Sequence, residues 1–367
     1  MKIGLVVPGF SEHERDWCIP ALLDYVRVLA IRAEVHVFTL RWPERGGQYA
    51  VFGATVHALY GGRRLGARVL SFWARATGAV ASEHRRGRFD VLHAFWVDEP
   101  GWVAAWAGRR LGVPVVLSLA GGELARLPDI GYGLTLMPGR RGLLNLALRQ
   151  AAVVTAGSAY FCAQARAESP ARKVEFAPLG VDTCLFQPPA QPAAAPVVLN
   201  VGALAPVKDQ ARLLRVFGAA AAQVPGAELL IAGDGPLRGH LGALAAGLPV
   251  RFLGAVEHAE LGALYGRASV LVQTSRHEAQ GLAVLEAAAC ALPAVGTMVG
   301  VLPEVGQAEV SDAGLVARVC QLLRDPAQRQ ALGQAARKQV LEQFSLEAAL
   351  ERFWQIYLRV GKSAGRA

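Results

Sequence analysis

Two glutamates eight positions apart, Glu278 and Glu286, lie in the part of this chain whose residue types most clearly suggest chemistry. Residues 277–286 read HEAQGLAVLE and lie between a predicted strand at 269–274 and a predicted alanine-rich helix. If that helix begins near Gly281, its free N–H groups and positive dipole end can bind phosphate, which a glycine lets approach closely. Glu286 then lies about 7.5 Å further along the helix axis, roughly the distance from a phosphate to a ribose. We therefore expect Glu286 to accept from ribose hydroxyls and Glu278 to reach a sugar beyond the phosphates. The alternative is one surface glutamate and one capping glutamate.

A lysine and two closely spaced glycines precede this segment. Gly202 ends a predicted strand, and Lys208 follows in a loop that enters a helix. A lysine there can contact the same diphosphate, although a loop lysine is more often simply solvated. Gly233 and Gly235 form a predicted tight turn between a strand and a helix, which is half of a dinucleotide-binding fingerprint. The third glycine, Gly239, comes one residue late, which argues against a nicotinamide site.

Further candidates follow the predicted strands of the first half of the chain, namely Gly9, Trp96, Gly121, Gly122 and Glu123. His93 lies at the end of a predicted strand, where its ring can position a hydroxyl or a proton. The alternatives are a hydrogen-bonded structural histidine and, for residues 121–123, a plain turn.

The elements that position these residues follow one pattern. Short apolar runs alternate with longer helical stretches, which is typical of a parallel sheet covered on both faces. A proline-rich stretch at 178–196 interrupts this pattern, which restarts at residue 197. We predict an α/β protein with two doubly wound, Rossmann-like lobes that face each other across a cleft, where such sheets bind ligands. The predicted parts are residues 1–187, residues 188–343 and a C-terminal helix at 344–367 that packs back on the first lobe.

The composition excludes several classes of protein. With 53% hydrophobic and 18% charged residues among 367, the chain is not disordered. No run of about 18 apolar residues predicts a transmembrane helix, and the start, MKIGLVVPG, reads as a strand rather than a signal peptide. The five cysteines are scattered and form no Cys-x-x-Cys pair, which predicts a reduced compartment and no zinc site.

The net charge of +9 is uneven, because the first 187 residues carry +7 of it. A basic half can face nucleic acid, an anionic membrane surface or phosphorylated substrates, or it can be a solvated arginine-rich surface. The sequence contains no recognisable nucleic-acid-binding module, so we expect no nucleic-acid partner.

A series of motifs runs in order along nearly the whole chain. In the second lobe they are VG at 201–202, Lys208, GDGPL at 233–237, Glu278 with Glu286, LPAVG at 292–296 and VLPEV at 301–305. The others are DVLHAF at 90–95, KVEFAPLGVD at 173–182 and FSLE at 344–347. Together they resemble glycosyltransferase family 4, the glycosyl transferases group 1. The resemblance implies the GT-B fold and retaining, metal-independent transfer of a hexosyl group from a UDP- or GDP-linked sugar to a hydroxyl acceptor.

The resemblance also implies a role for individual residues. Glu286 would hold the donor ribose and Glu278 the transferred sugar, while Lys208 and the backbone of Gly281 and Leu282 would hold the diphosphate. Gly202, Gly233 and Gly235 complete the expected donor site in residues 188–343, and residues 1–187 would bind the acceptor. The expected catalytic residues are Glu278 and Lys208, together with His93, which is a candidate from its position rather than from the resemblance. No Asp-x-Asp triplet occurs, which agrees with a diphosphate bound without metal, and no cofactor is expected.

The chain departs from the family pattern at several positions. Ala203 stands where members commonly have arginine, AGGE at 120–123 lacks a frequent histidine, and PGFSE at 8–12 lacks paired glycines. Two other functions therefore stay open: a homologue that binds nucleotide sugar with little or no turnover, and a nucleotide-sugar epimerase. We expect a cytoplasmic protein, with peripheral contact to an anionic inner-membrane surface if the acceptor is lipid-linked.

Overall fold

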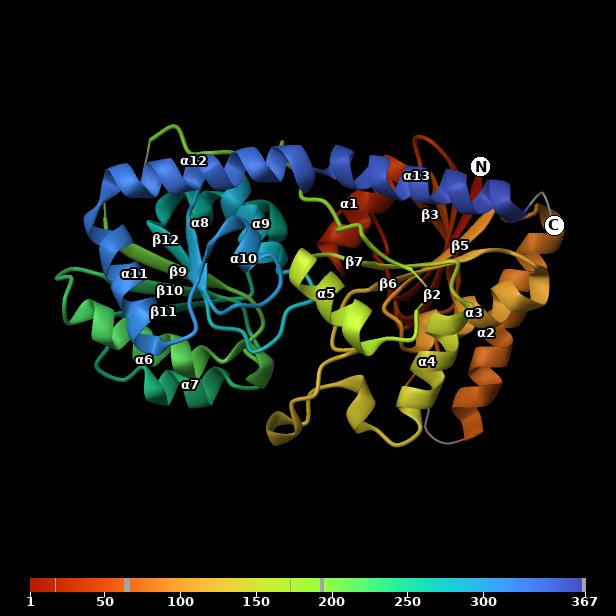
Figure 1. Ribbon diagram of the computed structural model, residues 1–367, viewed down its shortest axis with the longest axis horizontal. Coiled ribbons are helices and arrows are strands. Elements are labelled where there is room, and N and C mark those ends of the chain that lie inside the picture. The colour runs from red at the N-terminus through yellow and green to blue at the C-terminus, as the bar shows by residue number, and fades with distance from the viewer. Residues whose placement is uncertain (17, 63–66, 172, 192–194, 365–367) are drawn as a thin grey trace. The chain divides into compact units, whose positions relative to one another are not determined.

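The computed structural model describes residues 1–16, 18–62, 67–171, 173–191 and 195–364. The chain forms two compact units, which are coloured along the sequence in Figure 1. Unit 1 consists of Met1–Gly180 and Leu346–Ala367, and unit 2 consists of Val181–Ser345. Each unit is built on its own sheet.

The sheet of unit 1 has eight strands in the order β3-β4-β2-β1-β5-β6-β7-β8. All neighbours are parallel except β3 and β4, which form an antiparallel pair at one edge. The chain begins on β1 and adds strands on both sides of it, so the order reverses between β1 and β5. The strands are β1 (Lys2–Gly9), β2 (Glu34–Trp42), β3 (Gly47–Val51), β4 (Ala54–Ala58), β5 (Val91–Phe95), β6 (Val115–Leu119), β7 (Val153–Ala156) and β8 (Val174–Phe176).

Helices cover this sheet because its central strands are apolar on both faces. Every residue of β5 and β6 is buried, as expected for a parallel sheet between two helical layers. The helices of unit 1 are α1 (Pro20–Leu29), α2 (Ala67–Arg86), α3 (Glu99–Leu111), α4 (Arg140–Gln150), α5 (Ala159–Glu168) and α13 (Leu346–Ala364). Two short 3-10 helices, η1 (Pro128–Ile130) and η2 (Leu134–Leu136), lie between β6 and α4.

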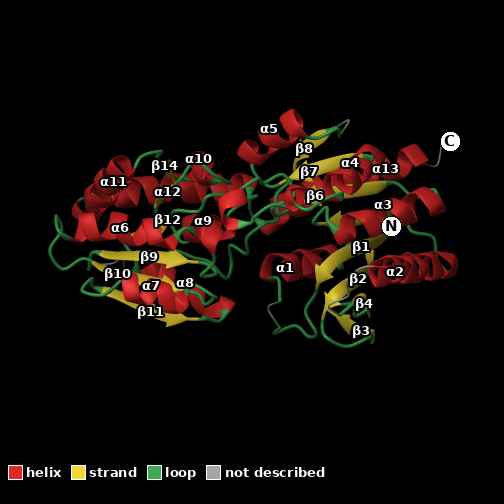
Figure 2. Ribbon diagram, turned by 90° about the horizontal axis from the view of Figure 1, so that it is seen from below, coloured by secondary structure: helices red, strands yellow, loops and turns green. Residues whose placement is uncertain are grey.

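The sheet of unit 2 has six parallel strands in the order β11-β10-β9-β12-β13-β14, and its order reverses between β9 and β12. In Figure 2 its strands lie between helices. The strands are β9 (Val197–Val201), β10 (Glu228–Ala232), β11 (Val250–Gly254), β12 (Val270–Gln273), β13 (Ala294–Gly296) and β14 (Gln307–Ala308). The helices are α6 (Gln210–Ala221), α7 (Arg238–Leu244), α8 (Leu261–Arg267), α9 (Leu282–Ala289), α10 (Leu302–Val305), α11 (Asp312–Arg324) and α12 (Pro326–Gln343), with 3-10 helices η3 (Pro206–Lys208) and η4 (His258–Glu260).

The C-terminal helical region is divided into α12, in unit 2, and α13, in unit 1. The two helices separate at Phe344 and Ser345, where Val181 N–H donates to the Phe344 carbonyl at 2.8 Å. Helix α13 packs on α1 and β5 through the apolar face expected from the sequence, which buries Phe353, Ile356 and Tyr357.

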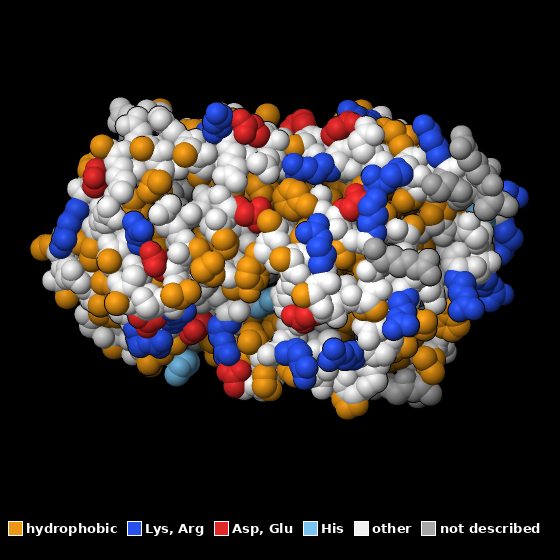
Figure 3. All heavy atoms as spheres, in the orientation of Figure 1, with side chains coloured by type: hydrophobic (Ala, Val, Ile, Leu, Met, Phe, Trp, Pro, Cys, Tyr) orange, Lys and Arg blue, Asp and Glu red, His pale blue; other side chains and the backbone are white. Residues whose placement is uncertain are grey.

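The positive charge is concentrated in unit 1, in agreement with the excess of Lys and Arg in the first 187 residues. On the face drawn in Figure 3, Lys and Arg side chains gather mainly over the residues of unit 1, at the right of the view. Among the described helices, none combines the length and the apolar character that crossing a membrane requires.

Candidate functional site

The N-terminus of α9 is the centre of the candidate site in unit 2. Gly281 is the residue before the first helical residue, Leu282, and has a left-handed φ of 93°. Glycine adopts this φ without strain, whereas other residues rarely do. A Cβ at Gly281 would be in ordinary contact, at 3.6 Å, with Gln273 Oε1, so the helix terminus lies next to the end of β12. The helix therefore begins as predicted, with its free N–H groups just after the loop that follows β12.

Glu278 and Lys208 meet at the side of this helix terminus. Lys208 Nζ lies 2.6 Å from Glu278 Oε1, although the two residues are 70 positions apart. The same oxygen accepts from Gln273 Nε2 at 2.9 Å and from Ser275 Oγ at 2.7 Å. A hydrogen bond of 2.9 Å from Thr274 Oγ1 to the Asp209 carbonyl ties the two loops together. Both side chains are partly buried, so this ion pair is better defined than a surface pair.

The loops that carry these residues follow β9 and β12, the two strands between which the order of the sheet reverses. In open α/β sheets, ligands bind beyond the carboxyl ends of the strands at such a reversal. The topology and the motif spacing therefore point to the same place in unit 2.

Glu286 lies on α9, where it is buried with a side-chain exposure of 11%. Its carboxylate accepts from the Tyr265 hydroxyl at 2.7 Å and approaches His258 Nε2 at 3.2 Å. Burial and the Glu286 charge raise the pKa of Tyr265 well above its usual range, so its hydroxyl remains a donor. The ring of Phe186 packs edge-on against both Tyr265 and His258. The sequence analysis missed both hydrogen-bond partners of Glu286, Tyr265 and His258, because they carry no motif and come from other elements of the chain.

The predicted glycines Gly202, Gly233 and Gly235 bring the loops after β9 and β10 together. A side chain at Gly233 would lie 2.0 Å from the Gly202 carbonyl oxygen, and one at Gly235 would lie 2.6 Å from that of Leu204. Gly202 N–H donates to the Ala232 carbonyl at 3.0 Å. These glycines therefore let the two loops pack closely, which shapes the loop that leads to Lys208.

His93, in unit 1, is fully buried. Its Nδ1 is 2.6 Å from the Tyr357 hydroxyl of α13 and its Nε2 is 2.7 Å from Ser118 Oγ. Burial lowers the pKa of His93 to about 3, so the ring is neutral at physiological pH. Both ring nitrogens are engaged inside the core. His93 therefore fits the structural alternative, and we assign it no catalytic role.

Glu123 has a comparable structural role. Its carboxylate accepts from three backbone N–H groups, those of Val97 at 3.0 Å, Ala120 at 3.1 Å and Gly121 at 2.7 Å. It thus joins the loops that follow β5 and β6. A carboxylate with these partners is a loop anchor rather than an acceptor-binding group.

Trp96, Gly121 and Gly122 lie together at the carboxyl ends of β5 and β6. Trp96 has a left-handed φ of 68°, and a side chain at Gly121 would lie 2.9 Å from its ring. A side chain at Gly122 would lie 2.8 Å from the ring of Tyr132. Gly9 ends β1, next to β5, so these predicted residues surround the reversal of the sheet order in unit 1.

Asp98 follows Trp96 closely and was not singled out from the sequence. Burial, with the negative charges of Glu123 and Glu99, raises the pKa of Asp98 to about 7. Within the described part of the chain, its Oδ1 is buried and has no hydrogen-bond partner. A carboxyl that titrates near neutrality in this region is able to exchange a proton with a hydroxyl.

Two family models match the chain, one for each half. The model described as Glycosyltransferase Family 4 matches residues 22–184, and the model described as Glycosyl transferases group 1 matches residues 184–339.

Several characterised proteins are similar to this chain. A GDP-mannose-dependent alpha-(1-6)-phosphatidylinositol monomannoside mannosyltransferase of Mycobacterium tuberculosis is 30% identical over 355 residues, which cover 82% of this chain and 92% of the relative. An N-acetyl-alpha-D-glucosaminyl L-malate synthase of Bacillus anthracis is 31% identical over 45% of each chain. A sulfoquinovosyl transferase of Arabidopsis thaliana is 26% identical over 74% of this chain. The matched region spans about half of the length of these last two relatives, 45% and 56%.

Solved structures share the fold. A sucrose-phosphate synthase from Thermosynechococcus elongatus superposes with a TM-score of 0.80 at 23% identity and covers 99% of this chain and 100% of its own. Anabaena HepE, in complex with UDP-glucose, superposes with a TM-score of 0.72 at 20% identity, covering 97% of this chain and 99% of its own. The predicted pair of parallel-sheet α/β domains, the GT-B fold, is thereby confirmed. With the mannosyltransferase matched over nearly its whole length and both halves of the chain matched by family models, this chain belongs to glycosyltransferase family 4, the glycosyl transferases group 1.

Proposed function

We propose that this chain transfers a hexosyl group from a nucleoside-diphosphate sugar to a hydroxyl acceptor, with retention and without a metal ion. The observation that carries the proposal is the 2.6 Å contact between Lys208 and Glu278 beside the N-terminus of α9, at the reversal of the sheet order of unit 2. Its relatives support a nucleotide-sugar donor, since one is GDP-mannose-dependent and HepE is in complex with UDP-glucose. We propose a uridine or guanosine diphosphate sugar as the donor.

The residues of unit 2 have distinct roles in this proposal. The N–H groups at Gly281 and Leu282 bind the diphosphate, with the positive end of the helix dipole behind them. The Lys208 ammonium stabilises the negative charge that develops on the leaving diphosphate. Glu278 accepts from a hydroxyl of the transferred sugar.

Glu286 binds the ribose. A carboxylate has about four acceptor positions, and Tyr265 and His258 occupy two of those of Glu286. The two neighbours fix its orientation and leave acceptor positions for ribose hydroxyls. In this proposal the sugar is transferred on one face through an oxocarbenium-like state, so the reaction needs no carboxylate nucleophile.

Unit 1 binds the acceptor. Trp96 is half-buried at the carboxyl end of β5, where its ring can stack on a sugar, and Gly121 lets the next loop approach this ring, while Gly9 and Gly122 lie at neighbouring strand ends. The excess of positive charge in the first 187 residues suits an anionic or lipid-linked glycan. We accordingly propose a cytoplasmic enzyme that works on such an acceptor in peripheral contact with an anionic membrane.

One observation favours a second function. Ala203 follows Gly202 where the family commonly has an arginine, so the site lacks one positive charge for the diphosphate. A homologue that binds nucleotide sugar but turns over slowly is therefore the alternative, and release of nucleoside diphosphate to an acceptor distinguishes the two.

The donor site is tested by calorimetric titration with UDP, GDP, ADP and their sugars. We expect micromolar binding of one nucleotide by the wild type, and at least tenfold weaker binding, about 1.4 kcal/mol, by Glu286→Gln. Glutamine keeps the shape of the side chain, but it has no negative charge and only one oxygen that accepts hydrogen bonds. The matched control is Glu342→Gln, an exposed glutamate of α12, which should bind like the wild type. If a folded wild-type protein bound no nucleotide, the transferase proposal would fail.

A further inference from the structure

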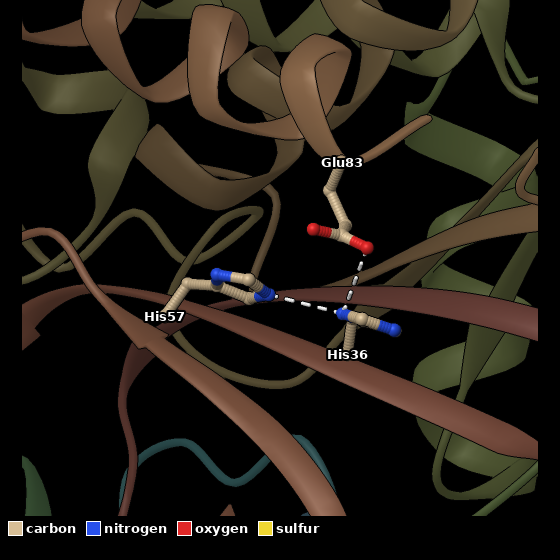
Figure 4. Close-up of side chains that lie close together, drawn as sticks. All are labelled: His36, His57 and Glu83. Atoms are coloured by element: carbon tan, nitrogen blue, oxygen red, sulfur yellow. Dashed lines mark hydrogen bonds and ion pairs between the residues drawn. The ribbon is translucent and has the colours of Figure 1, made fainter. Parts of the chain in front are cut away.

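Among the described residues, one group of side chains outside the candidate site brings three potential metal ligands together. His36 comes from β2, His57 from the neighbouring strand β4, and Glu83 from helix α2. Figure 4 shows the three side chains pointing toward one another from these elements. One ligand atom from each residue lies within 4.8 Å of the other two. His36 and Glu83 are buried, and His57 is partly buried.

The spacing of these atoms fits a small cation. His36 Nδ1 lies 3.0 Å from His57 Nε2 and 3.8 Å from Glu83 Oε1. Ligands of a tetrahedral zinc ion, each about 2.0–2.2 Å from the metal, lie roughly 3.3–3.5 Å from one another. The two observed distances fall on either side of that range, and the ligand atoms of His57 and Glu83 lie within 4.8 Å of each other, so the side chains would move closer together around an ion.

The surroundings hold the histidine rings in place. His36 Nε2 lies 3.0 Å from Glu34 Oε1, which directs the other ring nitrogen, Nδ1, toward His57 and Glu83. Metal-binding histidines commonly donate their second nitrogen to a carboxylate in this way. The ring of Phe38 stacks on His57 with centroids 4.6 Å apart, and Phe89 packs edge-on against His36 at 5.6 Å.

We propose that unit 1 binds one zinc ion between His36, His57 and Glu83. Two imidazole nitrogens and a carboxylate oxygen are ligands that zinc prefers, and three protein ligands leave a position for water. The ion would link β2, β4 and α2, and so stabilise the edge of the sheet near the antiparallel β3. The expectation of no zinc site came from the cysteines alone, whereas this cluster uses residues 21 and 26 positions apart with no recognisable spacing.

The proposed zinc site is separate from the residues assigned to transfer. His36 is the third residue of β2 and pairs with Gly4 of β1, so on these two strands the cluster lies toward the amino ends, while His57 is the fourth residue of the short β4. Gly9 is the last residue of β1, and Trp96 directly follows the carboxyl end of β5. The inference therefore does not depend on the proposed function.

Two cations contact Glu83: Arg86 Nη1 lies 3.4 Å from Oε2, and Lys2 competes with the metal for Oε1. Lys2 Nζ lies 3.0 Å from Glu83 Oε1 and also 3.0 Å from Glu34 Oε1. Zinc binding requires Lys2 to leave Glu83 and to keep only Glu34. Replacing Lys2 by methionine, which removes the positive charge, should therefore tighten zinc binding.

The test is zinc titration of chelator-treated, full-length protein against a chromophoric competitor. A Cys184→Ser background removes an exposed thiol that would otherwise bind zinc elsewhere. We expect one zinc ion per chain, and at least tenfold weaker binding in His57→Gln and in Glu83→Gln. The matched control is His240→Gln, an exposed histidine of α7, which should bind zinc like the parent.

Cobalt provides a readout that does not depend on a variant folding. Co²⁺ bound to the parent protein should show the visible absorption of a site with nitrogen and oxygen ligands and no thiolate charge-transfer band. Absence of stoichiometric binding by the parent would overturn the proposal. So would parental affinity in both His57→Gln and Glu83→Gln, or weaker binding in Lys2→Met.

Discussion

The ion pair of Lys208 and Glu278 has a consequence for how a donor would bind. A diphosphate at the N-terminus of α9 would compete with Glu278 for the lysine ammonium. Glu278 would still be held in place, because Gln273 and Ser275 donate to the same oxygen at 2.9 and 2.7 Å. Lys208 is therefore free to turn toward phosphate while Glu278 keeps its orientation for a sugar hydroxyl.

Asp98 makes the stability of the protein depend on pH. Burial and the charges of Glu123 and Glu99 raise the pKa of Asp98 from an ordinary value near 4 to about 7. Between these two pH values the unfolded chain is ionised at this residue while the folded chain holds a proton. The free energy of unfolding should therefore fall as the pH rises from about 4 to about 7, by up to about 4 kcal/mol from this group.

The Asp98→Asn variant is expected to lose this dependence and to be more stable than the wild type at pH 8. Urea unfolding at pH 5, 6, 7 and 8 measures the difference, and Asp129→Asn, at an exposed position, is the control. Parallel pH curves for the wild type and Asp98→Asn would contradict the raised pKa.

At the scale of elements, the loops after β9 and β10 depend on one close approach. Gly233 has a φ of 140°, and a Cβ there would lie 2.0 Å from the Gly202 carbonyl oxygen. Backbone cannot move away as a flexible side chain can, so the loops would have to separate. Gly233→Ala should lower the free energy of unfolding by about 3 kcal/mol and weaken nucleotide binding, since one of the loops leads to Lys208.

The same substitution at Gly239 separates this effect from a general effect of glycine. Gly239 is an exposed residue of α7, and a Cβ there would have no neighbour within 4 Å. Gly239→Ala should raise the free energy of unfolding by about 0.5–1 kcal/mol, because alanine favours a helix. Urea unfolding of the two variants should therefore give changes of opposite sign, and equal changes would contradict the role of Gly233.

At the scale of the molecule, the last helix belongs to the first unit. Helix α13 adds Tyr357 to a buried polar chain in which its hydroxyl lies 2.6 Å from His93 Nδ1 and 2.8 Å from the Tyr25 hydroxyl. These hydrogen bonds continue from His93 Nε2 to Ser118 Oγ at 2.7 Å and from Ser118 Oγ to Thr155 Oγ1 at 2.6 Å, across β5, β6 and β7. Residues at the end of the sequence therefore help to complete the core that its beginning forms.

Tyr357→Phe should lower the free energy of unfolding by about 1–3 kcal/mol, because His93 and Tyr25 lose a partner at a fully buried position. Tyr160→Phe, which removes a hydroxyl from a side chain that is 40% exposed, should change it by less than about 0.5 kcal/mol. Urea unfolding followed by circular dichroism compares the two. Equal changes in the free energy of unfolding would mean that the buried hydrogen bonds of Tyr357 add no stability.

Much of the fold is readable from local pattern. The alternation of apolar runs and helical stretches placed β1, β2, β5 and β6 because a strand buried on both faces must be apolar throughout. The antiparallel strand β3 was not predicted, since its residues are mostly exposed and its pairing depends on β4. The hydrogen bond from Val181 to the Phe344 carbonyl, where α12 and α13 separate, was not predicted, because it joins residues far apart in the sequence.

By itself, the sequence determined that the chain has two α/β domains and which family it belongs to. It also showed that the segment from Glu278 to Glu286 runs from a loop into a helix, because periodicity and fixed spacing are local properties of a chain. Only the tertiary structure decided that Tyr265 and His258 surround Glu286, that His93 belongs to the core, and that Asp98 is buried beside other carboxylates. The cluster of His36, His57 and Glu83 was likewise visible only in the tertiary structure. The physical reason is that burial and contacts between distant residues set hydrogen bonding, pKa and metal-ligand geometry, and these arise only when the strands and helices pack together.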